Sequence, residues 1–247
     1  MTTIIYNDNI FMDDIINDTL ESLIIGVYKN TVDKNKFLKQ SEKENISKQV
    51  RKDVTEIYLK SCINEKEESF EYFLNGLGYE GIKKLDEIVL QQKYRFPKQH
   101  LNEILESGRK IKILTKMPYF LSIQFYNDAE NSQIANALVN KNLRIITPNE
   151  YFHEQFPKSL SPDRASIKTA LLLKAVKEVK ESQDLTLYVD YNTENLKNIR
   201  NNIPKDQRKT KIVRHIGSVH TDICKEILDC FLDLDELKDY VKRGIIH

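Results

Sequence analysis

Leu185-Thr-Leu-Tyr-Val-Asp190 directly follows a long helical segment, and this pair of elements decides the fold. The helical segment begins at Ser161-Pro-Asp163, where serine predicts an N-cap, proline occupies the first helical position and the acid faces the positive helix end. It continues through Ala170-Leu-Leu-Leu-Lys-Ala-Val176 to about Ser182. Residues 185–190 then predict a strand, so a helix and a strand succeed each other.

The same alternation extends to both sides of this segment. The other predicted strands are residues 110–115, 143–147 and 210–215, and the other predicted helices are 128–140, 193–204 and 221–243. Strands that alternate with helices form a mostly parallel sheet through right-handed crossover connections. The sequence therefore predicts an α/β fold.

The residues before Arg109 predict a mainly helical region. Apolar residues recur at helical intervals over 10–28 and 50–63, and 67–77 predicts an amphipathic helix with Gly78 as its left-handed stop. A short helix over 97–107 begins with a proline. We therefore expect a helical region over 1–108 and an α/β region over 109–247, which together can form one continuous domain.

Composition places the chain among globular proteins. It has 247 residues, of which 40% are hydrophobic and 30% charged, and a net charge of +1. The three cysteines, an odd number without a CxxC pair, predict reduced thiols. The first residues do not have the pattern of a signal peptide, and apolar runs are short. We expect a cytoplasmic protein with no membrane contact.

Charge is unevenly distributed near the carboxyl end. Residues 198–214 contain six basic residues and one acid, whereas residues 222–239 contain seven acids and two lysines. Arg208, Lys211 and Arg214 of the basic segment are candidate phosphate contacts, so they would bind nucleic acid. The alternative is that both segments are solvated surfaces or pair with each other.

Three local patterns between Ser69 and Phe152 carry a resemblance to a known family. They are the helix and Leu-Gly-aromatic step of Phe70–Tyr79, the Gln-x-Lys pattern of Gln91-Gln-Lys-Tyr-Arg95, and the later strand–helix–strand over 113–146. This region resembles the Mrr-type restriction endonucleases, which have the PD-(D/E)xK nuclease fold.

The resemblance implies a nucleic-acid-acting enzyme, an Mg²⁺-dependent deoxyribonuclease of restriction or antiphage defence. It implies catalytic roles for Asp86, Gln91 and Lys93, metal binding by Glu80 and Asp86, and a phosphate contact by Arg95. Carboxylate and amide oxygens suit Mg²⁺, and the metal with the lysine activates water. The sequence departs from the family because Asp86 lies only five residues before Gln91, on the same predicted strand over 85–92.

Other readings of the sequence remain open. Residues 85–92 can be an ordinary strand, and the chain can be a non-catalytic α/β interaction module that binds a protein partner. A small ligand can also bind at the carboxyl ends of the predicted strands, as in other open α/β sheets. The polar residues at those ends are Thr115, Lys116, Thr147, Asn149, Glu150, Asp190, Asn192, His215, Ser218 and His220.

Overall fold

A six-stranded, all-parallel sheet forms the centre of the protein, which confirms the predicted α/β class. The computed structural model describes residues 2–7, 15–33, 37–64, 66–93, 98–126, 132–216, 230–231 and 233–243. The strand order is β3-β2-β1-β4-β5-β6. The strands are β1 (Thr2–Asn7), β2 (Lys110–Leu114), β3 (Leu143–Ile146), β4 (Leu185–Asp190), β5 (Lys211–Ile216) and β6 (Cys230–Phe231).

Strand β1 lies in the middle of the sheet, although the sequence analysis did not identify it. Tyr6 pairs with Ile113 of β2 on one side and with Val189 of β4 on the other. All six residues of β1 are buried, as expected for a strand covered on both faces. Residues on both sides of the expected 108/109 boundary therefore build one sheet.

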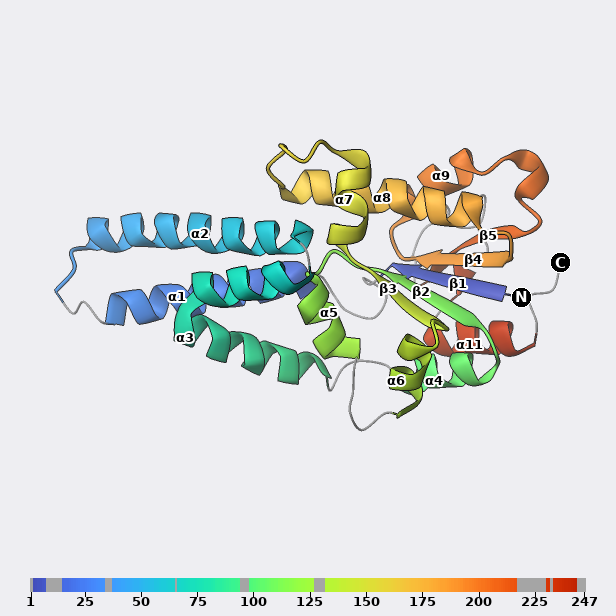
Figure 1. The fold of residues 1–247 in the computed structure, drawn as a ribbon, viewed down its shortest axis with the longest axis horizontal. Helices are drawn as coiled ribbons and strands as arrows, with labels where there is room; N and C mark the ends of the chain where they lie inside the picture. Colours follow the sequence, from blue (N-terminus) through green and yellow to red (C-terminus); the bar gives the residue numbers. More distant parts are fainter. Residues whose placement is uncertain are drawn as a thin grey trace.

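Helices cover both faces of the sheet, and Figure 1 shows their two layers. On one side lie α4 (Lys98–Glu106), α6 (Ser132–Val139) and α11 (Leu234–Lys242). On the other side lie α7 (Pro148–Gln155), α8 (Arg164–Glu181) and α9 (Thr193–Asn202). A short 3-10 helix, Lys205–Gln207, leads into β5. This arrangement buries the apolar strands from both directions.

A helical extension lies between β1 and β2 in the sequence and projects from one end of the sheet (Figure 1). It consists of α1 (Ile15–Asp33), α2 (Gln40–Ile63) and α3 (Lys66–Lys93), with α5 (Tyr119–Tyr126) at its base. Phe73 of α3 is fully buried and contacts Tyr58 of α2 and Phe120 of α5, with ring centroids 6.3 and 5.0 Å apart. These aromatic contacts join the extension to the α/β layers.

The strand predicted over 85–92 is wrong, because these residues continue helix α3. Gly78 adopts the left-handed, non-helical conformation expected of it (φ 65°), and the first helical stretch of α3 ends there at a kink. A second helical stretch follows the bend and reaches Lys93. No hairpin can form from a segment whose backbone hydrogen bonds are those of a helix.

Helix starts also differ in detail from the prediction. The N-cap of α8 is Asp163 rather than Ser161, since the Asp163 carboxylate accepts a hydrogen bond from the backbone N–H of Ser166. Asn192 is the N-cap of α9. Pro148 follows β3 and occupies the first turn of α7, where its missing N–H costs nothing.

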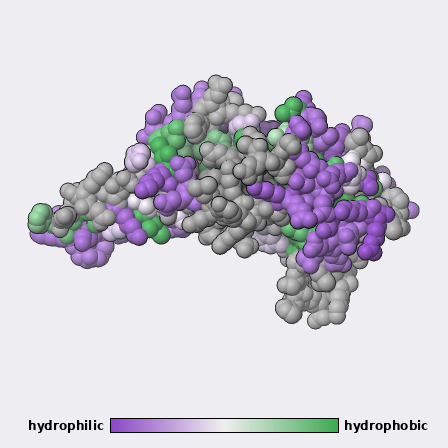
Figure 2. Space-filling view, turned by 90° about the horizontal axis from the view of Figure 1, so that it is seen from below, coloured by the Kyte–Doolittle hydropathy of each residue, from purple (hydrophilic) through white to green (hydrophobic). Residues whose placement is uncertain are grey.

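The face of the molecule seen in Figure 2 is mostly hydrophilic where its residues carry colour. Figure 2 shows hydrophobic side chains on one face only as small patches separated by hydrophilic ones, among the residues that carry colour. Large exposed apolar side chains such as Phe37, Val139 and Tyr79 come from different elements. Within the described ranges, every helix lacks the length and apolar character needed to cross a membrane.

We predict that Phe73→Ala lowers the free energy of unfolding by about 3–5 kcal/mol, because it leaves a cavity where α2, α3 and α5 meet. Urea denaturation measures this loss. The matched control is Tyr79→Ala on the same helix, where the side chain is 78% exposed and the expected change is below about 0.5 kcal/mol. Equal, small effects of both changes would contradict the packing described above.

Candidate functional site

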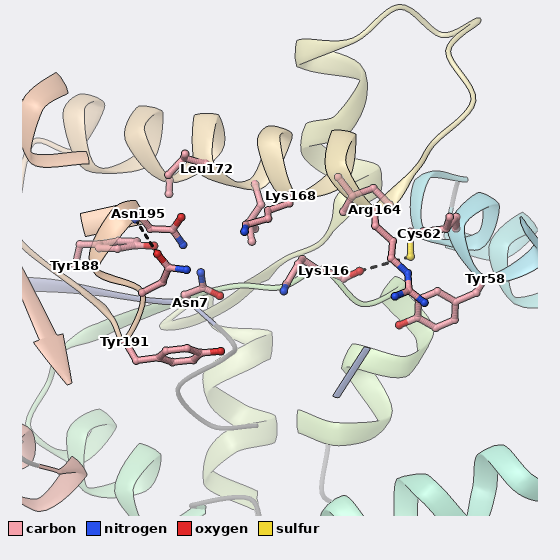
Figure 3. Close-up of a pocket in the computed structure, with 15 residues that line it drawn as sticks. Asn7, Tyr58, Cys62, Lys116, Arg164, Lys168, Leu172, Tyr188, Tyr191 and Asn195 are labelled. Carbon is pink, nitrogen blue, oxygen red and sulfur yellow. Dashed lines mark hydrogen bonds between the residues drawn. The ribbon is translucent and has the colours of Figure 1, made fainter. Parts of the chain in front are cut away.

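The crevice at the carboxyl ends of β1 and β4 is the candidate site. The next strand after β1 in the chain, β2, lies on one side of it, and the next strand after β4, β5, lies on the other side of β4. The strand order therefore reverses between β1 and β4, and ligands of open α/β sheets bind at such a point. A cavity of about 360 Å³ lies at this position. Its lining residues are Asn7, Tyr58, Leu59, Cys62, Lys116, Arg164, Ile167, Lys168, Leu171, Leu172, Ala175, Tyr188, Tyr191, Asn192 and Asn195 (Figure 3).

Asp190 fixes the floor of this crevice. It ends β4, is fully buried, and one carboxylate oxygen accepts hydrogen bonds from Asn7 Nδ2, the Tyr188 hydroxyl and Asn195 Nδ2, each at 3.0 Å. The other oxygen accepts the backbone N–H of Asn192 at 2.9 Å. Four donors thus surround the carboxylate, and it holds the Asn7 and Asn195 amides at the base of the cavity.

Three cationic side chains line the same cavity. Lys116 follows β2, whereas Arg164 and Lys168 occupy the first two turns of α8, four residues apart and hence on one helix face. Figure 3 shows the amines of Lys116 and Lys168 near Asn7 and Asn195, whereas the Arg164 guanidinium extends toward Tyr58. Among the described residues, Lys168 makes no ion pair, so its charge faces the cavity without an acid to offset it.

Two helices also begin at the cavity, which adds positive potential. Arg164 opens α8, and Asn192 caps α9 by accepting the backbone N–H groups of Glu194 and Asn195, both at 3.0 Å. The amino end of a helix carries a partial positive charge and favours anions. Because Asn192 already satisfies two N–H groups of α9, this helix contributes its dipole rather than free donors.

The end of α2 forms a more apolar wall through Tyr58, Leu59 and Cys62. The Cys62 thiol lies 3.5 Å from the carbonyl oxygen of Lys116 and is buried. Burial raises the pKa of the Cys62 thiol well above its usual range, so the sulfur stays protonated near neutral pH. A protonated thiol is a poor nucleophile, and Cys62 therefore supplies shape rather than reactivity.

The residues predicted to form a nuclease site lie elsewhere. Glu80, Asp86, Gln91 and Lys93 all belong to helix α3, and Arg95 lies outside the described residues. On a strand, positions 91 and 93 share one face, whereas on a helix residues two apart do not. Residues 91 and 93 thus lie on a helical backbone and not on the strand that the Gln-x-Lys pattern requires.

Lys211 and Arg208, two of the three candidate phosphate contacts of the basic segment, differ in their exposure. Lys211 is buried, and its amine donates to the carbonyl oxygens of Ser182 and, at 2.8 Å, Asp184; burial lowers its pKa. Arg208 is exposed and donates to the carbonyl of Arg200. Lys211 thus ties β5 to the turn before β4, and its predicted role at a surface is wrong.

The structure brings some of the residues predicted at the strand ends to one cavity. Lys116 and Asn192 line the cavity, Asp190 lies beneath it, and His215 supports it by binding the Tyr191 carbonyl through Nε2 at 2.8 Å. Thr147 and Glu150 instead cap α7, and Ser218 and His220 lie outside the described residues. Sequence reasoning missed Asn7, Tyr58, Arg164 and Lys168. The only available signal was the position of Arg164 and Lys168 on the first turns of a well-defined helix.

Comparisons of the sequence with known proteins do not identify a family for this chain. No protein-family model matches the chain, and no curated relative matches it. Among solved structures, the chain is similar to a hydrolase from Streptococcus pneumoniae described as a haloacid dehalogenase-like family protein. The TM-score is 0.40, the sequence identity is 12%, and the match covers 98% of each chain.

The structure itself corrects the predicted family and function. The Mrr-type resemblance requires a strand that carries the Gln-x-Lys pattern, whereas residues 85–93 have a helical backbone. The resemblance, with the nuclease, DNA-binding and antiviral roles it implied, is therefore wrong. The alternative of a non-catalytic module for a protein partner is not supported either.

We predict that Asp190→Asn lowers the free energy of unfolding by roughly 2–4 kcal/mol, because an amide NH₂ would then face several buried donors. Thermal or urea denaturation measures this effect. Asp206→Asn, at an exposed position of the 3-10 helix, is the control and should change stability by less than about 0.5 kcal/mol. A neutral result for Asp190→Asn would show that the carboxylate does not organise the crevice.

Proposed function

We propose that the crevice between β1, β4 and α8 binds a small organic anion, and that the anionic group is a phosphate. The observation that carries this proposal is the group of Lys116, Arg164 and Lys168 around a cavity at the switch point of the sheet. Its volume of about 360 Å³ falls within the range of small-molecule sites, about 300–1,000 Å³. A macromolecular substrate would need a longer groove.

The chemistry of the lining favours a phosphate group. Lysine amines and helix amino ends bind phosphate oxygens, and the amides of Asn7 and Asn195 offer neutral polar groups at the base of the cavity. The negative charge of Asp190 opposes such a ligand only weakly, since four donors surround it and it is not a lining residue.

The described lining residues supply binding groups rather than a reacting group. They comprise cations, amides, phenols, apolar side chains and a protonated thiol, and none of them is a carboxylate or an imidazole. We therefore assign recognition of the phosphate to the cations Lys116, Arg164 and Lys168 together with the amides of Asn7 and Asn195.

We expect any Mg²⁺ in this cavity to be bound through a phosphorylated ligand, and not by a metal site of the protein. Within the described ranges, no group of three or more His, Cys, Asp or Glu side chains could hold a metal ion. The Asp190 oxygens already accept four hydrogen bonds, so this acid does not fit a metal that needs oxygen ligands. A Mg²⁺ ion would arrive as the counter-ion of a phosphorylated ligand, and phosphate binding should persist in the presence of a chelator.

We predict that Lys168→Ala weakens the binding of inorganic phosphate about tenfold to a hundredfold, because a charge-assisted hydrogen bond contributes about 1.5–3 kcal/mol. Isothermal titration calorimetry and the phosphate-induced rise in Tm measure the loss. The control is Lys180→Ala, an exposed lysine at the other end of the same helix, which should bind phosphate as the unmodified protein does. Equal affinities for both variants, or no binding by the unmodified protein, would contradict the proposal.

A further inference from the structure

The cavity has an aromatic side that phosphate recognition does not use. Tyr191 follows Asp190 at the carboxyl end of β4, lines the cavity and is 42% exposed. Figure 3 shows its ring along one side of the cavity with the hydroxyl directed inward, while Lys168 and Leu172 of α8 lie on the opposite side. A cavity that bound phosphate alone would have no use for this surface.

The backbone around Tyr191 is held firmly. The buried His215 binds its carbonyl through Nε2 at 2.8 Å, the preceding residue is Asp190 with its four hydrogen bonds, and the following residue caps α9. A tyrosine ring has few rotatable bonds and loses little conformational entropy when it binds a ligand. An exposed ring on a fixed turn is therefore suited to stacking against a planar group.

The cavity also has more room than a phosphate needs. A water molecule occupies about 30 Å³ in the liquid, and a phosphate group is a few times that size. Most of the roughly 360 Å³ is left for the organic part of a ligand. The surface available to that part is aromatic and apolar, from Tyr191, Leu172 and the end of α2.

We propose that the ligand is a phosphate ester of an aromatic or heteroaromatic compound, whose ring stacks on Tyr191 while its phosphate contacts Lys168. This inference rests on the proposed function and specifies its ligand class. Stacking on an aromatic side chain favours any planar ring over an aliphatic group of similar size, because both surfaces are large and polarisable. Tyr191 would then determine specificity, and Lys168 would supply affinity for the charge.

Four probes test this inference by isothermal titration calorimetry, namely inorganic phosphate, glycerol phosphate, phenyl phosphate and adenosine monophosphate. We expect phenyl phosphate or adenosine monophosphate to bind about tenfold more tightly than glycerol phosphate. Comparison of these two aromatic probes shows whether the ring is a simple aryl group or a nucleobase. Tyr191→Leu should abolish the aromatic preference and leave the affinity for inorganic phosphate unchanged, whereas Tyr191→Phe should retain both.

Control measurements distinguish a failure of the stacking inference from a failure of the proposal that the cavity binds phosphate. Tyr79→Leu, which alters an exposed tyrosine of α3, should retain the preference for aromatic esters. If inorganic phosphate binds but aromatic esters gain nothing, or the preference survives in Tyr191→Leu, the stacking inference is wrong and phosphate recognition stands. If inorganic phosphate does not bind at all, both are overturned.

Discussion

The buried carboxylate of Asp190 is the constraint on which the crevice depends. Burial of a carboxylate costs free energy unless hydrogen-bond donors surround it. Here the donors are the side chains of Asn7, Tyr188 and Asn195 and the backbone N–H of Asn192. These hydrogen bonds join the end of β1 to the end of β4 and to the start of α9. The acid therefore holds together the elements that meet where the strand order reverses.

The cationic side of the cavity follows from the same topology. Because helices in a parallel sheet run opposite to the strands, α8 begins at the edge where β1, β2 and β4 end, and its first turns bring Lys168 beside Asn7. The helical extension closes another side through the end of α2, and the aromatic contacts of Phe73 hold it there. Sheet, helix ends and extension thus contribute different chemistry to one space.

Some of this arrangement could be predicted from the sequence. Alternating strands and helices after residue 109 gave the fold class, and Lys116, Asp190 and Asn192 were placed correctly at strand ends. Strand β1 was missed because six residues with polar ends, Thr2 and Asn7, give little periodic signal, and Asn7 was missed with it. A short apolar run looks alike in a strand and in a helix, so the sequence does not distinguish the two over residues 85–92. The break at Gly78 is predicted correctly, but not the second helical stretch of α3 that follows it.

The distinction between buried and accessible charges could not be predicted from sequence at all. Lys211 and Lys168 are both lysines close to apolar residues, yet one amine is enclosed by carbonyl groups and the other faces a cavity.

The most direct test of the account is a ¹H–¹⁵N NMR titration with inorganic phosphate. The account predicts the largest shifts in the side-chain amides of Asn7 and Asn195 and in the backbone around Lys168. Shifts confined to the basic segment over 198–214, or no shifts, would contradict it.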